Sequence, residues 1–153
     1  MTRQGIVSPR GFTLVELTVI LIIIGIIAVV AIPRFFDRRD FDTLKFYDRS
    51  LAAVRYAQKL AIAQRQPVYV VTTAAALSLC FDPGCTSPVT DPSTGSGLVV
   101  SAPAGNSVTN SASPSFSFDP LGRSSVAGPI TLTINGSPAR TFTVEQETGY
   151  VHP

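Results

Sequence analysis

The sequence contains a single histidine, His152, which stands second from the C-terminus. General-base and nucleophilic catalysis usually depends on a histidine beside a serine or cysteine, and His152 has no such neighbour. The chain also lacks a glycine-rich phosphate-binding loop. Asp82, Asp91 and Asp119 stand singly in turn-forming contexts, where aspartate commonly caps its own backbone. We therefore expect no enzyme and no bound cofactor, calcium or other metal.

Charged residues are scarce, at 14% of the chain, and they are unevenly distributed. Residues 66–153 contain two basic side chains, Arg123 and Arg140, beside five acidic ones. Nucleic-acid binding requires a basic patch on the folded surface, so we do not expect this chain alone to bind nucleic acid. Residues 34–65 instead carry eight basic and four acidic side chains.

The apolar run from Phe12 to Pro33 contains one formal charge, Glu16, in 22 residues. As a helix it would measure roughly 33 Å, against a hydrocarbon core of about 30 Å. Arg3 and Arg10 precede the run, and basic flanks remain on the cytoplasmic side of a membrane. The run therefore predicts a membrane span. A cleaved secretory signal is a weaker alternative, because the run is longer than a normal signal core and no clear cleavage site follows it.

Glu16 is the anomaly in this run, since a carboxylate in an apolar span is costly unless it is neutralised or paired. It follows Phe12 by four residues, which places the two on one helix face, one turn apart. If the chain were cut after Gly11, the new α-amine of Phe12 would supply a cation. A plain membrane anchor would leave both Glu16 and the Gly-Phe pair unexplained.

Two cysteines are present, Cys80 and Cys85, in the sequence Cys-Phe-Asp-Pro-Gly-Cys. In a translocated domain, a closely spaced pair of cysteines with a proline-glycine turn between them favours a disulfide. A metal site is the less favoured alternative, because it would need two further ligands and His152 is far away in the sequence.

The sequence Gly-Phe-Thr-Leu-Val-Glu at residues 11–16, followed by the apolar run and Pro33, resembles the class III signal of type IV pilins and type II secretion pseudopilins. The resemblance implies that prepilin peptidase removes a leader, residues 1–11, and that Phe12 becomes N-methylated. It implies that Glu16 is the assembly carboxylate. It also implies the partners, namely prepilin peptidase, other pilins or pseudopilins in a filament, and an inner-membrane assembly platform. The protein would cross the bacterial inner membrane once through residues 12–33, with its head in the periplasm, before entering a pilus or pseudopilus.

Pro33 predicts a kink in a helix that continues beyond it, because proline removes one backbone donor and crowds the preceding turn. Apolar residues then recur at spacings of three and four, which predicts an amphipathic half over residues 34–66 that ends near Gln64. The expected buried stripe consists of Leu44, Tyr47, Leu51, Val54, Gln58 and Ala61.

From residue 67 to 153 the period changes to two, and valine, threonine, serine and phenylalanine dominate. Strands are predicted over 68–73, 77–81, 98–101, 115–118, 130–134, 140–144 and 150–151, with a hairpin turn at Asn135-Gly-Ser-Pro. Residues 84–115 are predicted to form a long surface loop around one short strand, and the serine- and threonine-rich part at 86–113 has no role that the sequence assigns. The fold class is therefore α+β, with one antiparallel sheet of about five to seven strands packed on the helix.

Residues 51–65, 118–123 and 144–151 resemble the helix end and sheet of the GspH/FimT group of minor pseudopilins. Residues 32–36 resemble, more loosely, minor pilins of the mannose-sensitive haemagglutinin pilus. The resemblance implies a type IV pilin fold and a minor subunit, at the tip or in initiation or adhesion of a pilus. A minor pseudopilin of a type II secretion system is the first alternative. An unprocessed membrane protein with one span and a partner-binding head is the second.

Overall fold

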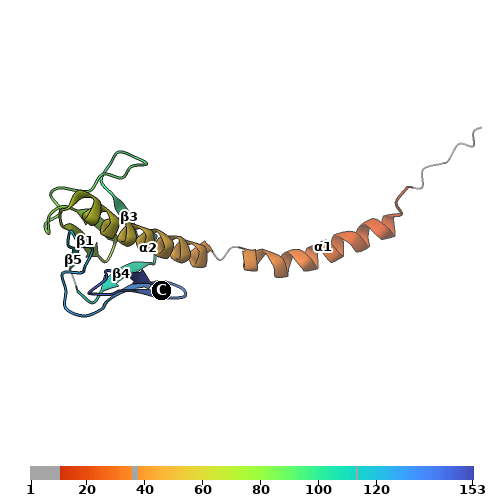
Figure 1. Cartoon of the computed structure of the whole chain (residues 1–153). Coiled ribbons are helices and arrows are strands. Elements are labelled where there is room, and N and C mark those ends of the chain that lie inside the picture. The colour runs from red at the N-terminus through yellow and green to blue at the C-terminus, as the bar shows by residue number, and fades with distance from the viewer. Residues whose placement is uncertain (1–10, 36–37, 113) are drawn as a thin grey trace, which may run out of the picture. The chain divides into compact units, whose positions relative to one another are not determined.

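The computed structural model describes residues 11–35, 38–112 and 114–153, without the side chains of residues 29–38. It separates into two units, one ending at Arg38 and the other comprising Arg39–Pro153. The first unit contains helix α1 (Leu14–Phe35), and the second contains nearly all of helix α2 (Arg38–Gln64) together with the strands (Figure 1).

Helix α2 ends at Gln64, where the sequence placed its end. Arg65 has a φ of 52°, the left-handed conformation that commonly terminates a helix. Pro67 follows, and a proline disfavours helical geometry in the residue before it. The local sequence therefore accounts for the stop.

The buried face of α2 is rotated from the predicted stripe. Leu44 is 37% exposed and Leu51 is half-buried, whereas Phe46 and Ala53 are buried. Eight residues of the face are buried: Thr43, Phe46, Tyr47, Ser50, Ala53, Val54, Ala57 and Ala61. Tyr47, Val54 and Ala61 belong to both stripes, so spacing alone left the rotation of the helix about its axis loosely defined.

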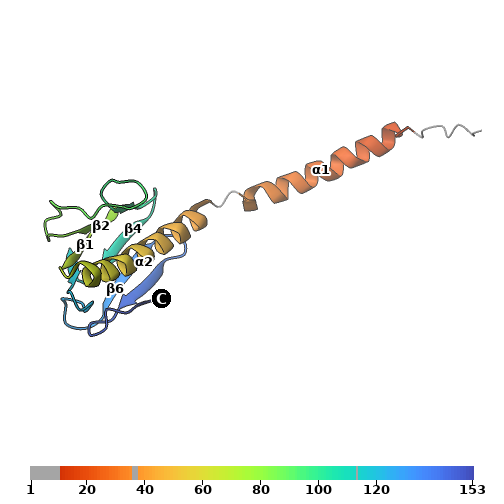
Figure 2. The same cartoon turned by 45° about the horizontal axis from the view of Figure 1, so that its top comes forward.

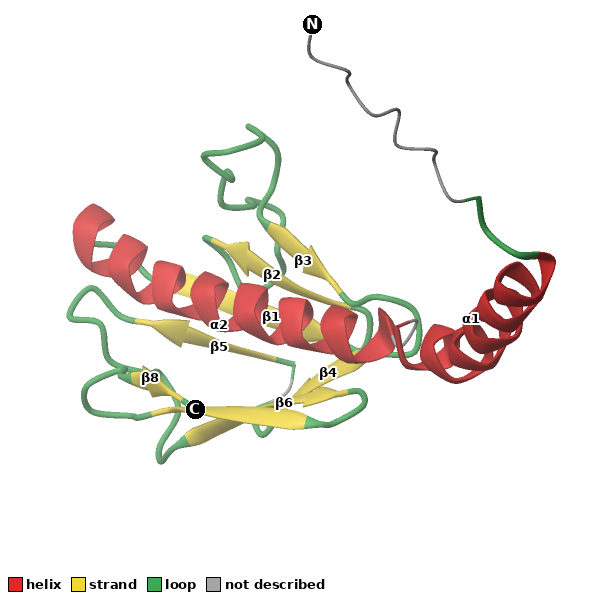
Figure 3. Ribbon diagram, turned by 90° about the vertical axis from the view of Figure 1, so that its right-hand side faces the viewer, coloured by secondary structure: helices red, strands yellow, loops and turns green. Residues whose placement is uncertain are grey.

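The strands form two antiparallel sheets of four strands each, in place of the single sheet expected. The first has the order β3-β2-β1-β5 and the second the order β4-β6-β7-β8. Their bounds are β1 Val68–Thr73, β2 Ala76–Cys80, β3 Val99–Ser101, β4 Ser107–Asn110, β5 Ser115–Phe118, β6 Ile130–Asn135, β7 Arg140–Val144 and β8 Val151–His152. Helix α2 lies along the strands (Figures 2 and 3).

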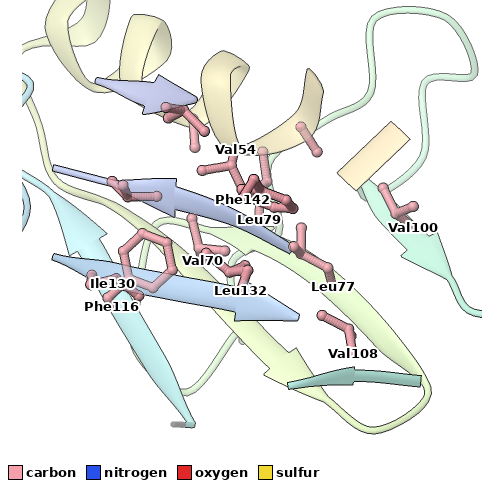
Figure 4. Packing of buried hydrophobic residues seen from close by; sticks show 14 of the residues in the cluster. Val54, Val70, Leu77, Leu79, Val100, Val108, Phe116, Ile130, Leu132 and Phe142 are labelled. Atoms are coloured by element: carbon pink, nitrogen blue, oxygen red, sulfur yellow. The ribbon is translucent and has the colours of Figure 1, made fainter. Parts of the chain in front are cut away.

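One core joins α2 to both sheets. Val54 of α2, Leu79 of the first sheet and Phe142 of the second are fully buried and lie near one another (Figure 4). The ring of Phe142 also meets Tyr47 edge to face, with 5.7 Å between centroids. Burial of one such side chain stabilises a fold by about 1.5–3 kcal/mol. The head therefore has its own core, built from the alternating residues of each strand.

The region predicted as a long loop is more ordered than expected. It contains β4, which the sequence did not predict, and a small hairpin closed by the bridge Thr90↔Gly97. Val89 in this hairpin is 2% exposed, and its N–H donates to the carbonyl of Leu79 at 2.8 Å. A buried valine thus anchors a segment whose serine and threonine content indicated only solvated loop.

Candidate processing and assembly site

The peptide bond between Gly11 and Phe12 lies in non-helical chain immediately before α1. Phe12 is 76% exposed, and a Cβ added at Gly11 would meet no atom within 4 Å. The bond therefore stands in exposed, non-helical chain at the start of the helix. The remainder of the predicted leader, residues 1–10, lies outside the described residues.

Helix α1 begins with a capping interaction at Thr13. The N–H of Glu16 donates to Oγ1 of Thr13 at 3.2 Å, and the N–H of Leu17 donates to the Thr13 carbonyl at 3.1 Å. Thr13 is therefore the N-cap and Glu16 the third helical residue, where a carboxylate faces the positive end of the helix dipole. The pattern Thr-x-x-Glu signals such a cap, so this role was visible in the sequence and was missed. Glu16 has a local role in starting the helix besides the assembly role predicted for it.

Apolar side chains surround the axis of α1 and are exposed in the first unit. Eleven large ones are between 39% and 78% exposed: Leu14, Val15, Leu17, Val19, Ile20, Leu21, Ile22, Ile23, Ile24, Ile26 and Ile27. A helix that is apolar all round is normally buried in protein or in lipid. This surface therefore requires an apolar environment from outside the chain. Among the described residues, no helix combines the length and the hydropathy needed to cross a membrane.

Pro33 lies within α1, two residues before the helix ends at Phe35. Helical structure resumes at Arg38, and residues 36–37 between the helices lie outside the described residues. The kink predicted at Pro33 therefore stays a prediction.

Cys80 and Cys85 form a disulfide with 5.1 Å between their Cα atoms. Asp82 organises the turn between them: its carboxylate accepts bonds from the N–H of Thr86 at 2.9 Å and of Ser87 at 2.7 Å. The bond from the Thr86 N–H, followed by that from Ser87, holds the pKa of Asp82 below its ordinary value. Asp82 is thus a turn residue, as are Asp91 and Asp119, each of which accepts bonds from nearby N–H groups. In the part of the chain that the structure describes, no group of acidic, histidine or cysteine side chains could hold a metal ion.

The two C-terminal segments that resembled the GspH/FimT group meet at the end of α2. Nε2 of Gln58 donates to the carbonyls of Gly122 and Thr148, at 3.1 and 2.8 Å. Gly149 has a φ of 61°, and a Cβ there would strike the Gly122 carbonyl. The helix, the turn after β5 and the turn before β8 are therefore held together at one point.

Comparison with known families supplies the identification. Residues 48–148 match the family described as "Type II transport protein GspH", and residues 8–32 match the "Prokaryotic N-terminal methylation motif". The chain belongs to the GspH family. The methylation-motif match contains Gly11, Phe12 and Glu16, so the resemblance noted in the sequence is confirmed.

Individual relatives of this GspH-family chain come from pili and from secretion systems. The "Type IV narrow pilus major component PilA5" of Thermus thermophilus is 41% identical over 59 residues, which cover 39% of this chain and 51% of that protein. The chain thus spans about half the length of this curated relative.

Two solved structures share the fold. The type IV minor pilin FimU of Pseudomonas aeruginosa superposes with a TM-score of 0.53 and 15% identity, over 76% of this chain and 87% of FimU. The minor pseudopilin EpsH of the Vibrio cholerae type 2 secretion system gives 0.52 and 18%, over 76% and 95%. The expected α+β type IV pilin fold is therefore confirmed, and family and fold are those of structural subunits.

Proposed function

We propose that this chain is a minor pilin, a structural subunit that is processed by prepilin peptidase and assembled into a type IV pilus. The observation that carries the proposal is the methylation-motif match over residues 8–32, which contains most of the exposed and largely apolar helix α1. The peptidase would cut between Gly11 and Phe12 and methylate the new amine of Phe12. The protein would then act as a component of a filament and as the substrate of an enzyme.

Residues 12–33 provide one apolar surface for two successive environments. Before assembly they anchor the chain in the bacterial inner membrane, with the head in the periplasm, and afterwards they pack in the filament core. The Cys80–Cys85 disulfide supports this placement of the head, because disulfides persist in oxidising compartments such as the periplasm. Extraction would require an inner-membrane assembly platform and neighbouring pilins as partners.

Glu16 would guide this assembly through its charge. Its carboxylate would neutralise the methylated amine of Phe12 on an adjacent subunit, so that docking removes two unpaired charges from an apolar environment. The Thr13 cap supports this role because it fixes the start of α1 and hence the height of Glu16 along the helix. A subunit that docks out of register would leave both charges unpaired.

A minor pseudopilin of a type II secretion system is the second candidate, favoured by the GspH match and by the fold shared with EpsH. The two candidates differ in phenotype. A strain lacking the gene should lose surface pili under the first and secretion of exoproteins under the second.

Intact-mass spectrometry of the protein from its native membrane tests the processing step common to both. A chain that starts at N-methyl-Phe12 is expected, and a Gly11→Val variant, with a β-branched side chain at the cut, supplies an unprocessed reference. A wild-type chain that still starts at Met1 would overturn the proposal in favour of an unprocessed membrane protein with a partner-binding head.

A further inference from the structure

Strand β3 is the outer strand of the first sheet and pairs only with β2. Just beyond it, the N–H of Ala102 donates to the Ala75 carbonyl at 2.8 Å. Hydrogen-bonded and non-bonded pairs alternate along an antiparallel ladder, so the N–H and C=O groups of Val99 and Ser101 point away from β2. No residue that the structure describes is paired with these four groups. The edge therefore offers two donors and two acceptors.

A hollow runs between this edge and α2. One part, of about 260 Å³, has Ala52, Ala53 and Tyr56 on the helix side and Leu98 and Val99 on the strand side. A second, separate part, of about 140 Å³, lies beside Ser101, and Arg49 borders both parts. The small alanines leave space on the helix side, which is the space that an added strand and its side chains would need.

Arg49 places a positive charge on this hollow without a close partner. It forms no ion pair with any described residue. The nearby carboxylate of Asp91 is already bonded to the hydroxyl and the N–H of Ser93, at 2.6 and 2.8 Å. These bonds, more than the charge of Arg49, hold the pKa of Asp91 below its ordinary value. Lys45 and Asp42, which border the second part, offset one another in charge.

We propose that the β3 edge binds an extended segment of a neighbouring filament subunit, which adds a strand beside β3 and places a carboxylate on Arg49. Strand addition draws its affinity from main-chain bonds and its specificity from side-chain pockets. Exposed edges are usually protected by charge, proline or a bulge, whereas Val99 at this edge is apolar and 52% exposed. The inference rests on the proposed function, because the filament supplies the neighbouring subunit.

Val99→Pro is the decisive variant, because it removes one outward N–H while leaving the bonds to β2 intact. Proline is tolerated on sheet edges for this reason, and Val99→Ala is the matched control that keeps the N–H. The variants are expressed as the full chain and processed in the cell. We expect Val99→Pro to lower the amount of chain found in sheared filaments about tenfold, and to leave the melting temperature of the head unchanged. Val99→Ala should stay within about twofold of wild type.

Two further measurements test strand addition at β3 even if the Val99→Pro variant does not fold. Arg49→Gln should lower incorporation about fivefold, whereas Lys59→Gln, elsewhere on α2, should not. A photo-crosslinker placed at residue 99 should join the chain to a segment of another filament subunit that contains Asp or Glu. Adducts to no filament subunit, or normal incorporation of Val99→Pro and Arg49→Gln, would overturn the inference. If wild type itself starts at Met1 and is absent from filaments, the proposed function fails instead.

Discussion

Gln58 of α2 binds Gly122 and the C-terminal segment at once: its Nε2 donates to the carbonyl of Gly122 at 3.1 Å and to that of Thr148 at 2.8 Å. In the sequence, Gly122 lies 64 positions after Gln58 and Thr148 lies 90 positions after it. A single amide therefore closes the end of the head opposite the start of α2. The bonds of Arg55 to the carbonyl of Val151, at 3.2 and 2.9 Å, extend the same attachment to β8.

Replacement of Gln58 by alanine should destabilise the head. The variant loses both hydrogen bonds from the Gln58 amide, and the carbonyls of Gly122 and Thr148 are left without this donor. We therefore expect the free energy of unfolding to fall by about 1–3 kcal/mol. Gln58→Glu should cost at least as much, because a carboxylate of similar shape would face two carbonyl oxygens. Urea unfolding of the processed chain measures the effect, and Lys59→Ala, exposed on the same helix, is the control. Equal stability of Gln58→Ala and Lys59→Ala would contradict the role assigned to Gln58.

Gly149→Ala tests the close approach beside this amide. Gly149 and Gly95 both have positive φ values, 61° and 73°. A Cβ at residue 149 would strike the carbonyl of Gly122, whereas one at residue 95 meets nothing within 4 Å. Gly95→Ala should therefore cost only the backbone strain of about 1–2 kcal/mol, and Gly149→Ala about 3 kcal/mol or more. Thermal unfolding of the two variants side by side measures the difference, and equal melting temperatures would show that the turn simply moves aside.

The parts of the fold that local pattern specifies were predictable, and those that depend on distant pairing were not. The β6–β7 hairpin alternates polar and apolar residues around a turn, so its pairs, such as Leu132↔Phe142, follow from the sequence. Strand β1 instead pairs with β5 as Val70↔Phe116, across 46 residues, and nothing local selects that partner. Strand β4 was missed because Val108 is its one apolar residue.

The candidate site divides in the same way. Gly11, Phe12 and Glu16 lie within six residues, so a linear motif specifies them. The cap at Thr13 was equally local and would have been found from the Thr-x-x-Glu spacing. The bonds of Gln58 join segments that only the folded core brings together, and the open edge of β3 depends on the order of strands in the sheet.

The two roles of Glu16 can be separated by a pair of variants. Glu16→Gln keeps a side chain that suits a capping box but removes the charge, whereas Thr13→Ala removes the cap, at about 0.5–2 kcal/mol of helix stability, and keeps the charge. If charge pairing with Phe12 guides assembly, Glu16→Gln and Glu16→Ala should both be processed and both enter sheared filaments poorly, about tenfold below wild type. Thr13→Ala should be incorporated better than either. Normal incorporation of Glu16→Gln would reduce Glu16 to a capping residue.

Loss of the Cys80–Cys85 disulfide should weaken the start of the Val89 hairpin. Closing so short a loop restricts the unfolded chain by about 2 kcal/mol on the chain-entropy estimate. Cys80 is fully buried at the end of β2, and its backbone forms an isolated antiparallel β-bridge with Pro88. Cys85→Ser should therefore lower the free energy of unfolding by about this amount, measured by urea titration, and dithiothreitol should lower that of wild type similarly without affecting the variant. A wild-type curve unchanged by the reductant would contradict a stabilising disulfide.

The contact between His152 and Glu145 should make docking of the C-terminal strand depend on pH. Nε2 of His152 lies 3.0 Å from Oε1 of Glu145 and Nδ1 lies 3.1 Å from the Pro153 carbonyl. The bond to Glu145 foremost, then that to Pro153, raises the pKa of His152 above its ordinary value of 6.5. A raised folded-state pKa adds stability that is complete below 6.5 and is lost as pH rises through the folded value.

Titration of the His152 ring by proton NMR on the processed chain checks this expectation directly. The midpoint should lie above 6.5 in wild type and return toward 6.5 in Glu145→Gln, which keeps the shape of the side chain without its charge. The N–H of Glu145 donates to the Tyr150 carbonyl at 2.9 Å and so reports docking of the C-terminal segment. Its hydrogen exchange should quicken between pH 6 and pH 8 more than the chemical rate alone requires, and His152→Gln should abolish the excess. A wild-type midpoint at or below 6.5 would mean that solvent screens the pair and that β8 is held by its pairing with β7 and by the bonds from Arg55 to Val151, without help from His152.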